Sequence, residues 1–459
     1  MKKIFSSIDI GSDSIKIVVC EYFQNKLNVL ASTKRKSDGI RNGIIVDSVK
    51  AKESIKNAIK EIDLSLGVRV DKAIINVPMY DAEYMINEGS TTITNEERVV
   101  TGTDMVNALQ GSIYNKIPKS RELVTIQPIK YNVDNEKKDL YNPRRIRADK
   151  LYVTSMSTTL PKKNIYVVIS ILQELGIEVI DILFGIIGDY YEFKTKEMEN
   201  SVCGVINIGS DTIETAVFKS GIIFNSNTIK TGSASIDTEI SYIYNVNPKQ
   251  AEKIKETFAI AHKEFASKTD VYEINNKLGI KTKINQYEIS DVVNSKLREM
   301  LEIAKKSLND LTKKEISYII ISGGIVNMPG FDILAKEIIG DKAAINMIKT
   351  IGVRDESYSQ ALGMIKYFID KLSIRGKEYT MFDDEKYLDL VENKKNNINN
   401  GIFINQIKKY IGAVLPNMND ISFENKNIKT KEYNAYDFFH IIGRYLIETN
   451  NKDNLLELY

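Results

Sequence analysis

Two short segments carry residues that could bind phosphate groups. An apolar strand, a Gly-Ser-Asp turn and a second β-branched strand occur at residues 8–19 and again at 206–217, with seven of twelve positions identical. A tight polar turn between two such runs predicts a β-hairpin. Glycine and small hydroxyl residues let backbone N–H groups approach phosphate oxygens, and an acidic residue before the turn can orient a hydrated Mg²⁺ ion. The duplication predicts two related domains around one nucleotide cleft.

A third segment has glycines where a flat ligand could approach the backbone. The buried strand predicted at 316–321 leads through Ser322 into Gly323 and Gly324, and Pro329-Gly330 follows before a helix at 331–339. A paired-glycine turn directly after a strand suits close contact between the backbone and a ligand. A helix is also predicted to begin at Pro248, because proline is favoured at the first helical position.

The elements that must position these turns follow from apolar periodicity. At 459 residues the chain is too long for one core, so two to four domains or subdomains are expected. Periodicity predicts helices at 50–66, 162–175 and 289–308, and strands at 26–31, 73–77 and 222–228. The polar, charge-rich stretch between Pro78 and Pro161 is typical of a small inserted α+β subdomain.

Composition excludes several classes of function. A formal charge of +2 gives no reason to expect a nucleic-acid partner. Cys20 and Cys203 form no CxxC motif and are expected to be buried strand residues, and the two histidines, His262 and His440, argue against a histidine-based metal site or hydrolase triad. Asp9 precedes any long apolar region and no run could span a bilayer, so a cytoplasmic protein without a signal peptide is expected.

These pieces, in this order, resemble the FtsA-type bacterial cell-division proteins of the actin-like ATPase superfamily. The resemblance covers about residues 3–370 and implies an α/β fold: an actin-like two-domain ATPase with an inserted α+β subdomain, followed here by an extra C-terminal tail. It divides the first actin-like domain between residues 1–82 and 161–200, with the inserted subdomain at 83–160. The second domain, including a partner-binding subdomain, spans residues 201–370. A linker follows at 371–400, and the tail occupies 401–459.

The resemblance also implies the nucleotide-binding residues. ATP with Mg²⁺ would lie between the two hairpins, with Asp9 holding the metal through water and Lys16 offsetting phosphate charge. Structural turns alone are the alternative for the hairpins, and an exposed helix face is the alternative for the two sugar- and base-contacting residues. The implied set is Asp9, Gly11, Ser12, Asp13, Ser14 and Lys16; Asn207, Gly209, Ser210, Asp211 and Thr212; Glu252 and Lys255; and Gly323 and Gly324.

The second hairpin departs from the family pattern, which has an acidic residue at Asn207 and glycines at Ser210 and Asp211. An amide carries no charge for Mg²⁺ and cannot act as a general base. Asp211 adds negative charge near the expected phosphates, which is unfavourable unless its side chain points away or reaches the metal. Glu214, after the turn, is one methylene longer than the acid usual there. We therefore predict ATP binding with slow or absent hydrolysis and assign no catalytic residue.

The tail has its own pattern. Residues 371–400 are polar and Asn-rich, which predicts a flexible linker. Residues 401–415 form one apolar helical face opposite a polar face, resembling the family's membrane-targeting helix. A helix packed on the protein is the alternative, and a second apolar segment at 436–447 is another candidate anchor or part of a small tail domain. The predicted membrane residues are Phe403, Ile404, Ile407, Lys408, Lys409, Ile411 and Val414.

The resemblance implies a nucleotide-dependent membrane tether. It would polymerise into filaments and recruit an FtsZ-like tubulin homologue to the inner face of the membrane, with Lys296 and Arg298 as candidates for binding that partner's acidic tail. A solvated helix face is the alternative for these two residues. A pilus-assembly-type scaffold that binds a membrane partner's peptide is a second hypothesis. A small-molecule phosphotransferase is a third, and Asn207 argues against it because that chemistry needs a carboxylate base.

Overall fold

Two five-stranded mixed sheets with the same topology frame the chain in the computed structural model, which describes residues 2–134, 136, 138–275, 277, 280–350, 352–353 and 355–399. In each sheet, three antiparallel strands are followed by two parallel ones. The first has the order β10(Glu178–Phe184), β6(Lys72–Val77), β1(Lys3–Ile10), β2(Ser14–Phe23), β3(Lys26–Lys36). The second has the order β13(Ile222–Ile229), β12(Ile213–Lys219), β11(Val202–Ile208), β16(Tyr318–Ser322), β17(Ala343–Ala344).

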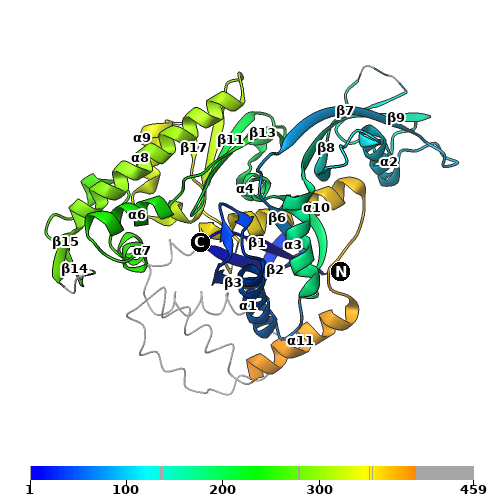
Figure 1. Cartoon of the computed structure of the whole chain (residues 1–459). Helices are drawn as coiled ribbons and strands as arrows, with labels where there is room; N and C mark the ends of the chain where they lie inside the picture. Colours follow the sequence, from blue (N-terminus) through cyan, green and yellow to red (C-terminus); the bar gives the residue numbers. More distant parts are fainter. Residues whose placement is uncertain are drawn as a thin grey trace, which may run out of the picture. The chain divides into compact units, whose positions relative to one another are not determined.

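Amphipathic helices cover the sheets and bury the apolar faces that the periodicity predicts. Helix α1(Ser48–Leu66) packs against β3 and β2, and the long α8(Gln286–Leu311) runs along the second sheet against β12 (Figure 1). Asp47 caps the first turn of α1, and Gly67 ends the helix in the left-handed conformation that glycine allows. The other covering helices are α3(Lys162–Glu174), α6(Ala234–Ile243), α7(Pro248–Thr257) and α9(Phe331–Ile339).

An inserted subdomain follows β6 and has its own small core. It contains β7(Glu83–Thr92), α2(Gly102–Ile113), β8(Arg121–Val133) and β9(Lys150–Pro161), with the sheet order β7-β9-β8 and α2 against β7 (Figure 1). Thr101 and Asp104 form a capping box at the start of α2. The core includes Met105, Leu109 and Tyr131, so this α+β unit buries apolar side chains of its own.

Two helices join the halves of the molecule. Helix α4(Gly185–Phe193) packs against β11 and β16 of the second sheet, and α10(Ser359–Arg375) packs against β1 of the first. The helices cross where Gly188 meets Gly363, and a Cβ at Gly363 would lie 1.8 Å from the Gly188 carbonyl oxygen. The crossing is therefore a direct backbone-to-backbone contact that only glycine permits.

The chain after residue 370 differs from the predicted linker where the structure describes it. Helix α10 continues to Arg375, and the Met381 N–H then donates to the Ile4 carbonyl oxygen at 2.9 Å, at the start of β1. Phe382 is buried, and helix α11(Asp384–Asn399) follows, with Leu390 buried and Lys386 paired with Asp71. Because the segment is mostly polar, its composition did not indicate that these few apolar residues would be buried. The predictions for the membrane-targeting segment at 401–415 and for the second apolar segment at 436–447 lie outside the described residues.

Short elements complete the described chain: β4(Ile40–Arg41), β5(Ile44–Ile45), α5(Lys196–Glu199), η1(Lys263–Phe265), β14(Val271–Asn275), β15(Lys281–Asn285), η2(Gly324–Asn327) and η3(Glu356–Tyr358). Among the helices that the structure describes, none combines the length and apolar character needed to cross a membrane.

Candidate functional site

The first predicted hairpin has a turn that only glycine fits. The Gly11 N–H donates to the Ser14 carbonyl oxygen at 3.1 Å, and an added Cβ at Gly11 would lie 2.9 Å from that same oxygen. The strands on either side pair in register, so that Asp9 lies opposite Lys16. The turn is therefore tight, and a side chain at position 11 would not fit in it.

The second hairpin repeats this geometry. The Gly209 N–H donates to the Thr212 carbonyl oxygen at 2.9 Å, and Asn207 lies opposite Glu214 as Asp9 lies opposite Lys16. Carbonyl oxygens of the turn, at Gly209 and Ser210, accept from the residues that begin α6, each at 2.9 Å. The predicted likeness of the two hairpins thus extends from sequence to hydrogen bonding.

Asp9 is held in a buried network at the end of β1. Its Oδ2 accepts from the Lys16 Nζ at 2.8 Å and its Oδ1 from the Asn76 Nδ2 at 2.7 Å. Burial disfavours the Lys16 ammonium, but the Asp9 carboxylate more than offsets that effect, so the pKa of Lys16 is raised. With both carboxylate oxygens engaged, Asp9 suits a metal ion held through water better than one bound directly.

A small turn spans the two hairpins. The Gly43 N–H donates to the Ser12 Oγ of the first hairpin at 2.8 Å, and the Asn42 N–H donates to the Asp211 Oδ2 of the second at 3.0 Å. Asn42 and Gly43 have φ of 50° and 74°, as a type I′ turn between β4 and β5 requires. Asp211 therefore turns its charge toward a backbone donor. This Asn-Gly pair was a readable hairpin signal that the sequence analysis missed.

The predicted sugar- and base-contacting residues of α7 are both in ion pairs. The Glu252 carboxylate accepts from the Lys36 Nζ of β3 at 2.6 Å, and Lys36 also lies 3.0 Å from Asp13 in the first turn. The Lys255 Nζ is 2.8 Å from the Asp237 Oδ2 of α6. Lys36 thus links the first hairpin to α7, whereas Lys255 is buried within its own half.

The turn after β16 also requires glycine. Gly323 has a φ of 104°, and a Cβ there would lie 2.3 Å from the Ile208 carbonyl oxygen at the end of β11. At Gly324 the nearest atom to an added Cβ is the Ser357 Cβ at 3.6 Å, so space remains beside this residue. The structure thus brings the glycine pair next to the second hairpin, as the sequence predicts.

One buried carboxylate of this region escaped sequence analysis. Asp189 of α4 is completely buried and accepts hydrogen bonds from Asn207, Ser359 and Gln360. Burial raises the pKa of Asp189 to about 6, although the donors from α10 oppose the shift. An aspartate in a mostly apolar helix was the available signal, but its partners are 18 to 171 residues away in sequence.

Glu214 makes the stability of the protein depend on pH. Burial raises the pKa of its carboxyl to about 8 from 4.5, and the carboxylates of Asp189 and Asp9 act in the same direction. The folded protein keeps this proton up to about pH 8, whereas the unfolded chain releases it near pH 4.5, so stability falls as pH rises through that window. We expect Glu214→Gln to gain roughly 2 kcal/mol over the wild type between pH 6 and pH 8.

Urea unfolding of both proteins at the two pH values measures this effect. The matched control is Glu53→Gln on the exposed face of α1, which should keep the pH dependence of the wild type. Parallel pH profiles for the wild type and Glu214→Gln would show that Glu214 is already ionised at pH 6.

The partner-binding candidates lie on one helix but face different neighbours. Lys296 of α8 pairs with Glu299 at 3.2 Å and lies 3.9 Å from Glu239 of α6, whereas Arg298 pairs with both oxygens of Glu337 of α9. Residues two apart on a helix point in nearly opposite directions. The structure therefore does not join these two side chains in one site.

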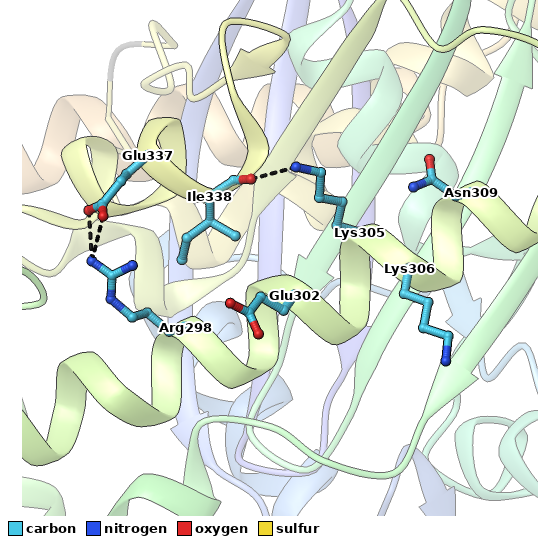
Figure 2. Close-up of a pocket in the computed structure, with 7 residues that line it drawn as sticks. All are labelled: Arg298, Glu302, Lys305, Lys306, Asn309, Glu337 and Ile338. Carbon is cyan, nitrogen blue, oxygen red and sulfur yellow. Dashed lines mark hydrogen bonds and ion pairs between the residues drawn. The ribbon is translucent and has the colours of Figure 1, made fainter.

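Arg298 instead borders an open depression between α8 and α9, with a volume of about 490 Å³ (Figure 2). The Lys305 Nζ donates to the Ile338 carbonyl oxygen at 2.7 Å, while Lys306 extends from the same helix (Figure 2). The lining residues are Arg298, Glu302, Lys305, Lys306, Asn309, Glu337 and Ile338, three basic and two acidic side chains.

Comparison with known proteins finds similar sequences among cell-division proteins. A family model for cell division protein FtsA matches residues 204–363. The cell division protein FtsA of Bacillus subtilis (strain 168) is 23% identical over 379 residues, covering 82% of this chain and 86% of that protein. The protein of the same name from Staphylococcus epidermidis (strain ATCC 12228 / FDA PCI 1200) is 25% identical over 391 residues, covering 83% of each. Over most of its length the chain is therefore similar to the FtsA family of cell-division proteins.

A solved structure shares the fold of this chain. A solved structure titled "PilM-PilN type IV pilus biogenesis complex" aligns with 81% of this chain and 98% of its own, with a TM-score of 0.52 and 13% sequence identity. At that identity the likeness concerns the fold. The predicted actin-like two-domain α/β architecture is confirmed.

Proposed function

We propose that this protein binds ATP between its two hairpins, polymerises, and tethers the tubulin-like division protein to the inner face of the cytoplasmic membrane. The observation that supports the nucleotide site is the pair of equivalent turns at Gly11 and Gly209. The glycine N–H closes each turn with a hydrogen bond, and the Asn42–Gly43 turn binds to both. The space beside Gly324 suits the adenosine. Asp9 would hold Mg²⁺ through water, since its oxygens are already engaged.

The same geometry supports slow or absent hydrolysis. Asn207 has no charge and, as an amide, cannot act as a general base. Asp189, which accepts a hydrogen bond from Asn207, is completely buried and so out of reach of bulk water. We also propose the domain limits 1–82 with 161–200, 83–160, and 201–370. The two sheets and the separate core of the insert support them, although α10 at the end of the last range packs on the first sheet.

The membrane role rests on residues 401–415, where Ile407 and Ile411 share the apolar face and Lys408 and Lys409 the polar face. One amphipathic helix binds a bilayer weakly, and each basic residue adds about 1 kcal/mol near anionic lipid. Polymerisation would multiply this affinity through avidity. The depression beside Arg298 is the proposed site for an acidic partner tail, which would compete with Glu337 for the guanidinium.

Co-sedimentation with anionic liposomes tests the tether. The full chain should pellet more strongly with Mg-ATP, and Ile407→Glu with Ile411→Glu should abolish pelleting because charges replace the apolar face. The matched variant Phe438→Glu with Ile442→Glu alters the second apolar segment and should pellet normally. If the first variant still pellets and the second does not, the later segment is the anchor. If the wild type binds ATP but never pellets, the tether proposal is wrong.

A further inference from the structure

The carboxylate of Asp189 lies at the junction of the two halves. Its Oδ2 accepts from the Asn207 Nδ2 of β11 and the Gln360 Nε2 of α10, both at 3.0 Å, and its Oδ1 accepts from the Ser359 Oγ at 2.5 Å. Asn207 belongs to the second sheet, whereas α10 packs on the first. A single buried carboxylate therefore receives donors from both halves.

Asn207 is oriented by this contact. Its Nδ2 donates to both Asp189 and the Ser322 Oγ, at 3.0 and 3.1 Å, so both amide hydrogens are used. Its Oδ1 faces the second turn, since an added Cβ at Gly209 would lie 3.9 Å from it. Asn207 thus presents an uncharged oxygen to the proposed phosphate site and its donors to Asp189.

An acid at position 207, as in the family pattern, could not share this arrangement with Asp189. Two ionised carboxylates about 3 Å apart in a buried site repel strongly, and one would have to keep a proton. Asn207 and Asp189 therefore avoid the repulsion that two carboxylates would suffer. Exchanging the two groups would preserve the hydrogen bond but place the charge on β11.

We propose that Asp189 and Asn207 form a carboxylate–amide pair in which Asp189 is a positioning residue at the junction: it holds the Asn207 amide so that the uncharged oxygen of Asn207 faces the second turn. This inference rests on the proposed nucleotide site, because the second turn is one side of that site. The negative charge of the pair stays on the side of α10, where Asp189 accepts from Ser359 and Gln360.

A double-mutant cycle on the full chain, without nucleotide, tests the pair. Asn207→Asp should lower the melting temperature by about 5 °C or more, since it opposes two buried carboxylates. Asp189→Asn should change it less, because the new amide oxygen can accept from Asn207 and Gln360 while the amide N–H donates to the Ser359 Oγ. The paired substitution should recover at least half of the summed loss. If Asn207→Asp is insoluble, the paired variant should be soluble.

Asn87→Asp is the matched control. Asn87 is equally buried, in β7, and its Nδ2 donates to the Ser157 Oγ rather than to a carboxylate. Its combination with Asp189→Asn should give additive losses within about 2 °C. Additive losses, or insolubility, in the pair itself would overturn the proposal.

The rate of phosphate release from ATP distinguishes a positioning role of Asp189 from a merely structural one. The paired variant places a carboxylate oxygen beside the Gly209 turn, where it can accept from water, so we expect at least a tenfold rise in ATP hydrolysis. A paired variant that binds a fluorescent ATP analogue but releases phosphate no faster than the wild type contradicts the proposal. Failure of the wild type itself to bind the analogue would count against the proposed function, while the melting cycle would still decide the pair.

Discussion

Gly363→Ala is expected to prevent stable folding of the protein. The added Cβ would lie 1.8 Å from the Gly188 carbonyl oxygen and 2.4 Å from its carbonyl carbon, so backbone rather than a flexible side chain blocks it. Relief requires α4 and α10 to separate along their whole contact. We expect a loss of roughly 4 kcal/mol or more, at the upper end for single substitutions.

Urea unfolding, or soluble yield if the variant aggregates, measures this loss. Gly324→Ala is the matched control for stability, because an added Cβ there meets only the Ser357 Cβ at 3.6 Å. It should change the free energy of unfolding by less than about 1 kcal/mol. A Gly363→Ala protein as stable as the control would show that the two helices do not cross this closely.

Lys16→Met is expected to damage stability and nucleotide binding together. It leaves the Asp9 carboxylate, only 3% exposed, without its cation, and breaking one side of a buried ion pair costs about 3–5 kcal/mol. The loss of a charge-assisted contact to phosphate should weaken affinity for an ATP analogue by roughly 10- to 100-fold.

The two effects can be separated by neutralising the pair. Asp9→Asn combined with Lys16→Met removes both charges, so stability should return toward the wild type while the affinity for the analogue stays low. Lys52→Met, which removes an ion pair with Glu174 on α1 and α3, should change neither quantity. Wild-type affinity in the combined variant would show that Lys16 serves only to neutralise Asp9.

Local patterns predicted the elements that depend on nearby residues. The long helix predicted at 289–308 is α8, with Val293, Leu297 and Leu308 buried as its periodicity requires, and the repeated Gly-Ser-Asp turns form equivalent hairpins. Helix geometry alone could also have separated Lys296 from Arg298, since residues two apart face different neighbours. These features need no knowledge of the tertiary fold.

The contacts that tune the site could not be predicted in this way. The role of Asp189 depends on donors from β11 and α10, and the direction of Asp211 depends on the backbone of Asn42. Likewise, the polar stretch after residue 370 did not indicate that the Met381 N–H would donate to Ile4 at the start of β1. Each case joins residues far apart in sequence, where composition and periodicity carry no information.

The hydrogen bond between Met381 and Ile4 has a mechanical consequence. Tension on the chain beyond α11 would first load the contacts of Leu390 and Lys386 in α11. It would then reach residues 380–382 and β1, where the Ile4 N–H donates to the Thr380 Oγ1 at 3.0 Å. The opposite end of that strand is Ile10, next to the Gly11 turn. A force applied at the tail and a ligand bound at the turn therefore act on the two ends of one strand.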